Sequence, residues 1–585
     1  DNSSWPAGPN LPNIYVGSLG IMGTIYYFIS STIQRREKVA SFFVLTIFIL
    51  SCVHEFTSKL WHMGQNPAGF FYRFSWIMAF FLVYLAYLAL REVDQLHWKP
   101  SIVIAGGTLV LFAIVMSRQY SFLIVPQKIA TVALIFVMLS ILVWPQINKR
   151  WAFLATVTAI ELMMNATIVQ SRVGYTDAYK YQDAVKQLQT AVAPIRPNDK
   201  EFYRIQGSFH LSKNDPFMAD YPGMSVFSSN LENATRDLFE QLGNTGINAT
   251  TYYYGTPLSD AIFSLKYWMT PKPVYTKDYP DTSKMYVFGN YATRLDLTEN
   301  TPVVYEEERT EVFQIPQTLP IAFGVNEKLA SLELRMNQPI QTYNKITMAQ
   351  LGEQEKYLEM LAANDITTDN FQATDRTETY RRIDATKPAS ITYHLTPQTN
   401  EEYWVTLPTR FSRTDTNLIR IFLNGEEYHF LNNYQATQFV NIASQSMDKP
   451  IELKIEVNTD EDYSFSGVRL VKSNRSVSNR FIQERQIQAL KLTHWDNSHI
   501  QGTVTITDDS SVMFTSIPYD KGWIVKVDGK VVETRKIWNS LLGFAITNGE
   551  HTIELSFIPE GWFAGVGISI VSFIVLLGLI YKKWI

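Results

Sequence analysis

The sequence predicts a polytopic α-helical membrane protein with a large extracellular α+β region ending in two β-sandwich-like modules and a final transmembrane helix. Three observations support this fold class. Long apolar runs fill residues 1–170 and return near the end of the chain, the middle of the chain is polar, and turn-separated strand patterns begin near residue 386. At 585 residues the chain is also too long for one compact domain.

Each of the apolar runs is predicted to cross a bilayer as a helix, because about 20 such residues span the hydrocarbon core. The runs are Ile14–Ile33, Val39–Val53, Phe74–Leu90, Ile102–Met116, Ile129–Ile147, Trp151–Val169 and Trp562–Tyr581. The first six make up a predicted transmembrane domain, residues 1–170, and the last lies in a C-terminal segment, 559–585.

Basic residues orient these helices. Lys and Arg cluster at 35–38, 149–150 and 582–583, which are connections or ends that would share one side of the membrane. The positive-inside rule places that side in the cytoplasm. The loop around residues 54–73 and the whole 170–558 region are then extracellular.

The first residue, Asp1, also falls outside the cell in this topology, and no signal peptide precedes it. We therefore expect an upstream segment and interpret the chain as the C-terminal part of a longer polytopic protein. The single cysteine, Cys52, lies in an apolar run. A large exported region without disulfides favours a bacterial cell surface. The net charge of −4 gives no indication of nucleic-acid binding.

The polar middle of the chain is predicted to contain three folding regions. Residues 171–385 show helical periodicity and form an α/β region. Residues 386–475 and 476–558 show strand patterns and form two β-sandwich-like modules, the second one beginning with a helix. Asn424-Gly425 and Asp528-Gly529 predict tight hairpin turns, because this dipeptide type readily adopts the required left-handed backbone.

Four tryptophans in the predicted modules are candidates for stacking on sugar rings: Trp404, Trp495, Trp523 and Trp538. The CH faces of sugars pack well on exposed aromatic rings. The alternative is that these side chains fill the cores of the modules or the space between them. Trp523 follows Gly522 at the start of a strand, which suits a core position.

The loop LWHMGQNPAGFFYRFSW, residues 60–76, places a cation and several donors at the outer end of a predicted membrane helix. Arg73, Tyr72, His62 and Gln65 are candidates for binding a phosphate there. An arginine fork grips two phosphate oxygens and stays charged at membrane depth. The alternative is an ordinary interface, where Arg extends to lipid head groups and Tyr belongs to the aromatic belt.

Five further polar residues are candidates for lining a cavity beside this loop: His54, Glu55, Arg118, Lys128 and Glu161. The first four have solvated or interfacial roles as alternatives. A carboxylate in the sixth helix is costly unless it is paired, so we expect Glu161 to pack against a polar partner in upstream helices. No metal cluster or cofactor motif is evident, and a divalent cation stays open because acidic ligands could lie upstream.

Several stretches together resemble one family of proteins. They are PNIYVG (12–17), WHMGQNPAGFFYRFSW (61–76), SVFSSNLENATRDLFEQLG (225–243), FSLKYWM (263–269) and the long block SIPYDKGWIVKVDGKVVETRKIWNSLLGFAITNGEHTIELSFIPEGWFAG (516–565). This is similar to the YfhO family of bacterial membrane proteins over essentially the whole chain. The last block is the most specific, because a chance match of that length is improbable.

The resemblance implies a GT-C-like fold and a glycosyltransferase activity. Such an enzyme takes a hexosyl or N-acetylhexosaminyl group from a polyprenyl-phosphate-sugar lipid donor. It passes the sugar to a cell-envelope polymer, lipoteichoic acid or another wall glycan, outside the membrane of a Gram-positive bacterium. Arg73, Tyr72, His62 and Gln65 would then bind the donor phosphate, among membrane lipids.

The catalytic carboxylate of GT-C enzymes lies in the first extracellular loop, which we expect upstream of residue 1. No catalytic residue is therefore assigned within the chain. A different reading remains open, in which the protein is a non-catalytic, membrane-anchored factor that binds or assembles wall glycan.

Overall fold

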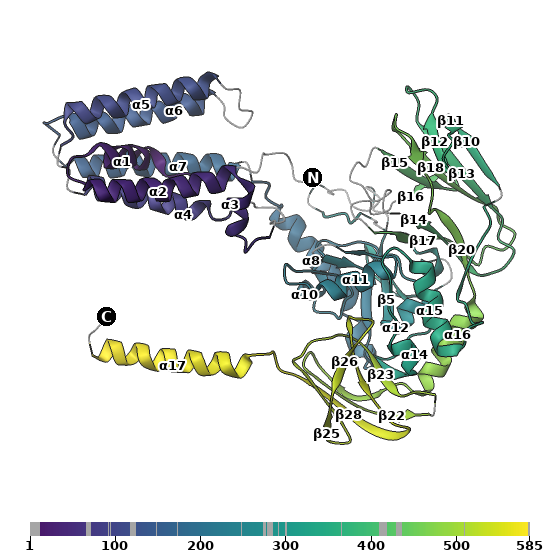
Figure 1. Ribbon diagram of the computed structural model, residues 1–585. Coiled ribbons are helices and arrows are strands. Elements are labelled where there is room, and N and C mark those ends of the chain that lie inside the picture. The colour runs from purple at the N-terminus through teal and green to yellow at the C-terminus, as the bar shows by residue number, and fades with distance from the viewer. Residues whose placement is uncertain are drawn as a thin grey trace. The chain divides into compact units, whose positions relative to one another are not determined.

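A computed structural model describes the chain except at residues 1–11, 66–71, 92, 94, 118–124, 148, 172, 247–248, 273–276, 278–282, 284, 290–291, 299–300, 364, 409–417, 429–435, 508 and 583–585. The chain divides into two compact units, Asp1–Tyr175 and Thr176–Ile585. The first unit is helical, and the second combines an α/β region with two sandwiches and a C-terminal helix (Figure 1).

The helices of the first unit are α1 (Gly17–Ile29), α2 (Arg35–Val53), α3 (Glu55–Leu60), α4 (Ser75–Leu90), α5 (Trp98–Ser117), α6 (Val125–Val143) and α7 (Arg150–Ser171). α1 and α4 approach closely at Gly23, where an added Cβ would lie 2.6 Å from the Cβ of Ala86. Such small residues let apolar helices pack backbone to backbone.

Four helices are long and apolar enough to cross a membrane by length and composition: α5, α6, α7 and α17 (Trp562–Tyr581). α1 and α4 are apolar but shorter. α2 spans 19 residues and begins with the charged run Arg35 to Lys38. The predicted helices are therefore all present among the described residues, and four of them meet the full length of a span.

The α/β region opens the second unit. Its elements are α8 (Ala178–Val192), α9 (Ile195–Asn198), β1 (Arg204–Gly207), α10 (Asp215–Met218), β2 (Val226–Phe227), α11 (Asn233–Gln241), β3 (Thr245–Gly246), β4 (Ala249–Thr251), α12 (Pro257–Ile262), β5 (Leu265–Pro271), α13 (Leu295–Thr298), β6 (Val303–Glu306), β7 (Thr310–Gln314), β8 (Ala322–Val325), α14 (Glu327–Ala330) and α15 (Pro339–Leu351). Its main sheet has the order β1-β5-β7-β6, and the β1–β5 pair is parallel.

The first sandwich contains β9 (Leu358–Met360), β10 (Ile366–Asp369), β11 (Phe371–Ala373), β12 (Thr379–Arg382), β13 (Ala389–Leu395), β14 (Glu402–Leu407), β15 (Ile419–Leu423), β16 (Glu426–Tyr428), β17 (Gln438–Ser444), β18 (Ile451–Val457), β19 (Tyr463–Ser464) and β20 (Arg469–Ser473). Its two larger sheets have the orders β10-β13-β18-β15-β16 and β17-β14-β20-β9. Strands β9 to β12 precede residue 386, so this module begins earlier than the sequence predicts.

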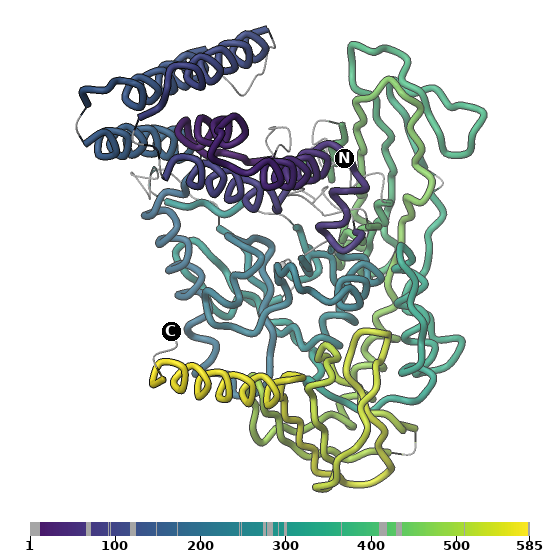
Figure 2. Tube along the Cα trace, turned by 60° about the vertical axis from the view of Figure 1, so that its left-hand side comes forward, coloured from purple at the N-terminus to yellow at the C-terminus, as the bar shows by residue number. Residues whose placement is uncertain are grey.

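The second sandwich contains α16 (Arg475–Ile487), β21 (Lys491–Trp495), β22 (His499–Ile506), β23 (Val512–Pro518), β24 (Trp523–Val527), β25 (Lys530–Val532), β26 (Thr534–Ile537), β27 (Leu541–Ala545) and β28 (Gly549–Phe557). Its sheets have the orders β21-β22-β28-β24-β25 and β26-β27-β23-β8. The last strand, β8, comes from the α/β region, so residues 476–558 do not form a self-contained module. Figures 1 and 2 show the two sandwiches on opposite sides of the α/β region.

Both predicted hairpins are confirmed. At the β24–β25 turn, Asp528 and Gly529 have φ values of 52° and 76°. At the β15–β16 turn, Asn424 and Gly425 have φ values of 52° and 85°. Two consecutive positive φ angles are typical of the turn that matches the right-handed twist of paired strands.

Candidate functional site

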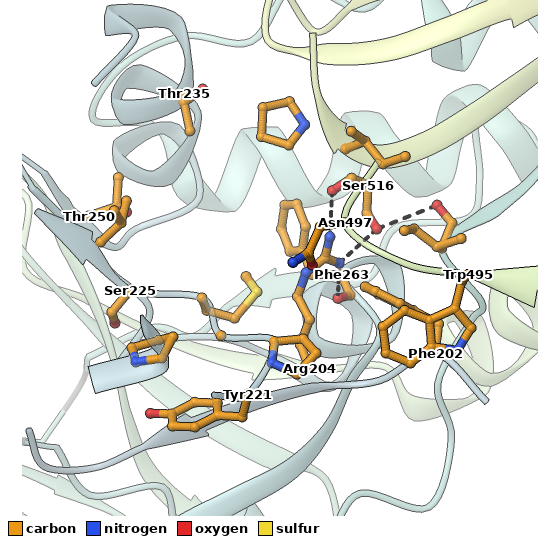
Figure 3. Close-up of a pocket in the computed structure, with 18 of the residues that line it drawn as sticks. Phe202, Arg204, Tyr221, Ser225, Thr235, Thr250, Phe263, Trp495, Asn497 and Ser516 are labelled. Atoms are coloured by element: carbon orange, nitrogen blue, oxygen red, sulfur yellow. Dashed lines mark hydrogen bonds between the residues drawn. The ribbon is translucent and has the colours of Figure 1, made fainter. Parts of the chain in front are cut away.

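The second unit contains a cleft with a volume of about 710 Å³ (Figure 3). One wall comes from β1, α11 and the segment 216–226, and the other comes from β21, β23 and β24 of the second sandwich. The two walls thus belong to chain segments some 312 positions apart, the separation of Arg204 and Ser516. Clefts between packed modules are common places for ligands to bind.

Arg204 begins β1, lines the cleft and links its two walls. Its Nη1 donates hydrogen bonds to the Phe263 carbonyl at 2.6 Å and to the Ser516 hydroxyl at 2.8 Å, and its Nη2 donates to the Ser516 carbonyl at 2.9 Å. The Cζ atom lies 4.9 Å from the centre of the Phe202 ring. Burial lowers the pKa of Arg204 to about 10, so the guanidinium stays charged at neutral pH.

Two of the four candidate tryptophans, Trp495 and Trp523, line this cleft and are half-buried. Trp495 meets the ring of Phe202 edge to face, with centroids 5.2 Å apart. Trp523 packs against Phe557 with centroids 5.1 Å apart. These contacts fix the orientation of both indoles and leave part of each ring open, which is what a stacking platform requires.

Charged groups also line the cleft. Arg196 pairs with Asp220 at 2.8 Å. Asp496 accepts hydrogen bonds from the amides of Ser498 and His499, each at 2.7 Å. These bonds lower the pKa of Asp496 to about 2, so its carboxylate is ionised at neutral pH. Aromatic faces, a half-buried cation and a fixed carboxylate together can bind a ligand that has both apolar faces and polar groups.

The other two tryptophans are core residues, and the prediction that they stack on a glycan is wrong. Trp404 is 0% exposed and stacks on Phe439, with ring centroids 5.4 Å apart and an interplanar angle of 13°. Trp538 is 5% exposed and donates its indole N–H to the Leu329 carbonyl at 3.0 Å. Neither ring has a face open to a ligand.

In the first unit, the described residues on either side of 66–71 meet in an aromatic stack. Trp61 lies between Phe48 of α2 and Phe74 before α4, with centroid distances of 5.6 Å and 5.0 Å. Its indole N–H donates to the hydroxyl of Ser51 at 3.0 Å. The stack packs Trp61, which follows α3, and Phe74, which precedes α4, against the second half of α2.

The candidate phosphate-binding residues lie around this stack. The rings of His62 and Tyr72 have centroids 6.4 Å and 6.3 Å from the centroid of Phe74. Arg73 is exposed beside Phe74, and Gln65 is exposed in the turn that follows α3. The residues between Gln65 and Tyr72 lie outside the described part of the chain. Phosphate binding by these four residues stays a prediction.

The remaining candidates are dispersed over the first unit. His54 lies between α2 and α3, and Glu55, the first residue of α3, pairs with Lys59 at 2.6 Å. Lys128 of α6 donates to a carbonyl of α5 at 3.3 Å and lines a cavity of about 290 Å³ between those helices. Arg118 lies outside the described residues.

Glu161 has its polar partner within this chain. Its side chain is buried in α7 and accepts hydrogen bonds from the amide and the hydroxyl of Ser18 in α1, at 2.9 Å and 2.6 Å. The expectation that its partner would lie in upstream helices is therefore wrong. The contact satisfies a carboxylate that would otherwise be buried at high cost.

Metal binding finds no support in the part of the chain that the structure describes. No three His, Cys, Asp or Glu side chains there are placed to hold one ion. That no cofactor is needed stays a prediction.

Sequence reasoning did not find Arg204 or Phe202. The four-residue sequence of β1 is not distinctive, because many short strands have a similar one. The hydrogen-bond partner of Arg204, Ser516, lies far along the chain. The only local signal was the block from residue 516 onward, which carries much of the family resemblance.

Comparisons with solved structures give weak likenesses that carry no argument about fold. A glycosyl hydrolase family 2 member from Bacteroides cellulosilyticus DSM 14838 matches with a TM-score of 0.12 and 10% identity, covering 30% of this chain and 24% of that one. A conserved protein of unknown function from Pseudomonas aeruginosa PAO1 matches with a TM-score of 0.12 and 10% identity, covering 34% of this chain and 93% of that one.

Sequence comparison is more informative. A stretch of 122 residues is 28% identical to the uncharacterized protein YfhO of Bacillus subtilis (strain 168). It covers 21% of this chain and 14% of that relative. The family model described as bacterial membrane protein YfhO matches residues 1–569, nearly the whole chain. The resemblance seen in the sequence motifs is thereby confirmed, and the chain belongs to the YfhO family of bacterial membrane proteins.

Proposed function

We propose that this protein is a membrane glycosyltransferase that moves a sugar from a polyprenyl-phosphate donor to a cell-envelope polymer outside the cell. The acceptor is lipoteichoic acid or another wall glycan of a Gram-positive bacterium. The observation that carries the proposal is the cleft of the second unit, with its two half-buried tryptophans and its charged lining. Membership of a bacterial membrane protein family supports it.

The cleft suits a glycan chain in both shape and chemistry. Its volume of about 710 Å³ lies within the range of sites that enclose small ligands. Trp495 and Trp523 offer faces on which sugar rings stack. Arg204, Asp496 and Asn497 offer donors and acceptors for hydroxyl groups. We assign the cleft to the acceptor polymer.

The donor is assigned to the helical unit. A leaving polyprenyl phosphate gains negative charge as the glycosidic bond breaks, and a positioned cation stabilises that charge. Arg73 supplies the cation, and His62, Tyr72 and Gln65 supply further donors nearby. No general base is assigned among the described residues.

This function requires several membrane crossings, with the second unit outside the cell. The basic clusters at 35–38 and 149–150 favour that orientation. α17 then returns the chain to the membrane. None of the residues of α17 is buried within the second unit, which suits a helix that lipids surround.

The test is a transfer assay with the full-length protein in lipid vesicles. A radiolabelled polyprenyl-phosphate hexose is the donor, purified wall polymer is the acceptor, and label in the polymer is measured. We expect transfer that falls when Trp495 and Trp523 are both replaced by Ala. Polymer binding without any transfer would instead support the non-catalytic glycan-binding alternative. Absence of both binding and transfer would overturn the proposal.

A further inference from the structure

Arg204 is a half-buried cation without an acidic partner among the described residues. Its three hydrogen bonds go to two backbone carbonyls and one hydroxyl, all of them neutral. The other cleft arginine, Arg196, pairs with Asp220. Removing part of a charged group from water costs free energy, and neutral acceptors compensate that cost only in part.

The guanidinium also keeps one edge for a ligand. The end formed by Nη1 and Nη2 holds the hydroxyl and carbonyl of Ser516, and the outer hydrogen of Nη1 reaches the Phe263 carbonyl. The Nε–H and the second hydrogen of Nη2 have no partner among the described residues. These two donors point the same way from a planar group, which is the arrangement that binds two oxygens of a carboxylate or phosphate.

An aromatic platform adjoins this cation. The Phe202 ring contacts both Arg204 and Trp495. Its centroid lies 4.9 Å from the Cζ of Arg204 and 5.2 Å from the ring centroid of Trp495. Figure 3 shows Arg204, Phe202 and Trp495 near one another, where the two walls of the cleft meet. Phe202 thus connects the indole to the guanidinium through one direct contact with each.

We propose that Arg204 forms an anion subsite, so that the cleft selects a glycan carrying a phosphate or carboxylate beside a ring stacked on Trp495. This inference rests on the proposed glycan-binding role of the cleft and names the chemical class of its ligand. A purely structural role would be to join β1 to β23 through Ser516. That structural role needs only the hydrogen bonds from Nη1 and Nη2 to Ser516. It does not explain why the group is charged or what the donors on the Nε side of the guanidinium bind.

The experiment compares three ligands that share one ring: glucose, glucuronate and glucose 6-phosphate. Their affinities for the full chain in detergent are measured by ligand-observed NMR, with inorganic phosphate alone as a fourth ligand. We expect glucuronate or glucose 6-phosphate to bind at least about tenfold more tightly than glucose, because charge-assisted bidentate bonds are strong. Which of the two binds better identifies carboxylate or phosphate as the anion. Binding of inorganic phosphate as tight as that of glucose 6-phosphate would overturn the role of the stacked ring.

Arg204→Gln should lower the affinity for glucuronate and glucose 6-phosphate far more than the affinity for glucose, and so abolish the preference for the charged sugars. Arg535→Gln is the matched control, because Arg535 pairs with Glu327 outside the cleft. An equal loss for all three sugars in Arg204→Gln would show a structural role and overturn the inference. If that variant fails to fold by its melting temperature, Arg204→Lys, which keeps the charge but not the fork, should show a reduced preference.

The wild-type protein alone can also decide the matter. Equal affinity for glucose, glucuronate and glucose 6-phosphate would overturn the anion subsite and leave the glycan-binding role intact. Failure of all three sugars to bind, while purified wall polymer also fails, would instead overturn the proposed function of the cleft.

Discussion

Glu161 of α7 receives hydrogen bonds from both the amide and the hydroxyl of Ser18 in α1, although 143 positions separate the two residues. The first amides of a helix have no partner within it, and the positive end of its dipole favours an anion. Glu161 thus caps α1 from another helix. Gly17, with a φ of 71°, brings the backbone close: an added Cβ would lie 3.5 Å from the carboxylate.

This cap predicts the response of α1 to mutation. Glu161→Ala should lower the stability by about 1–3 kcal/mol, because it leaves buried donors unpaired. Ser18→Ala should cost less, since the amide keeps its acceptor. The measurement is thermal unfolding in detergent, with Thr167→Ala as the control, because the Thr167 hydroxyl bonds only to its own helix at Met163. A control that loses as much stability as Glu161→Ala would contradict the role of the cap.

The cleft tryptophans should affect binding rather than folding. Trp495→Ala and Trp523→Ala should each weaken binding of wall polymer by roughly twofold to tenfold, the range expected for loss of an aromatic stack. Tyr179→Ala, which removes an exposed ring of α8 outside the cleft, should leave binding unchanged. Binding is measured by co-sedimentation with the polymer.

The buried tryptophan of the same sandwich should behave in the opposite way. Trp538→Ala should destabilise the protein by about 3–5 kcal/mol, because it leaves a cavity in the core. Its indole also donates to the Leu329 carbonyl. Chemical unfolding of the full chain measures this loss, and an unchanged midpoint would show that the core assignment fails.

Arg73 should matter to sugar transfer through its shape as well as its charge. Arg73→Lys replaces a planar fork with a single ammonium and should slow transfer about tenfold or more if Arg73 grips the donor phosphate. Arg91→Lys, at the opposite end of α4, is the control and should transfer normally. Unimpaired transfer by Arg73→Lys in the vesicle assay would remove Arg73 from the site.

The Asp183–Arg309 pair should make stability depend on acid. Its bidentate bonds, both 2.7 Å long, hold α8 to the residue that precedes β7 and lower the pKa of Asp183 below its usual value of 3.8. As the pH falls, Asp183 is protonated in the unfolded chain before it is protonated in the folded protein. The pair therefore stabilises the fold in full above the pKa that Asp183 has in the unfolded chain. It is lost as the pH falls through the lower folded pKa.

The measurement for this pair is urea unfolding of the full chain between pH 7 and pH 3. Asp183→Asn should lower the stability at neutral pH and reduce its loss in acid. Asp220→Asn should change the stability little, because the Arg196–Asp220 pair is exposed and such pairs contribute at most about 1 kcal/mol. A wild-type protein as stable at pH 3 as at pH 7 would contradict the assignment.

Short-range features of this protein were readable from its sequence. Both hairpins depend on dipeptides that adopt left-handed backbone, and the apolar helices depend on runs of adjacent residues. The hydrogen bonds from Arg204 to Ser516 and from Ser18 to Glu161 could not be predicted from the sequence, because each joins residues far apart in the chain. Local composition carries no trace of such a pairing.

The tryptophans show the same limit within a sheet. β14 lies between β17 and β20 and is buried along its whole length, so no alternation marks an open face. Trp404 of β14 stacks on Phe439 of β17, and Phe439 in turn contacts Tyr343 of the α/β region. The α/β region therefore covers the face of the sheet that carries Trp404. A pattern of strand residues cannot show which faces a distant segment will cover, and Trp404 was misassigned for that reason.

The pairing of β8 with β23 sets an order for folding during synthesis. β8 is synthesised well before its partner strand β23, Val512–Pro518. The backbone edge of β8 that pairs with β23 therefore stays unpaired while the whole first sandwich is synthesised. Arg204 and Phe202 are likewise synthesised before their contact residues, Ser516 and Trp495. The cleft is thus among the last features to form, and a chain that stalls within the second sandwich would have an open sheet edge in place of a cleft.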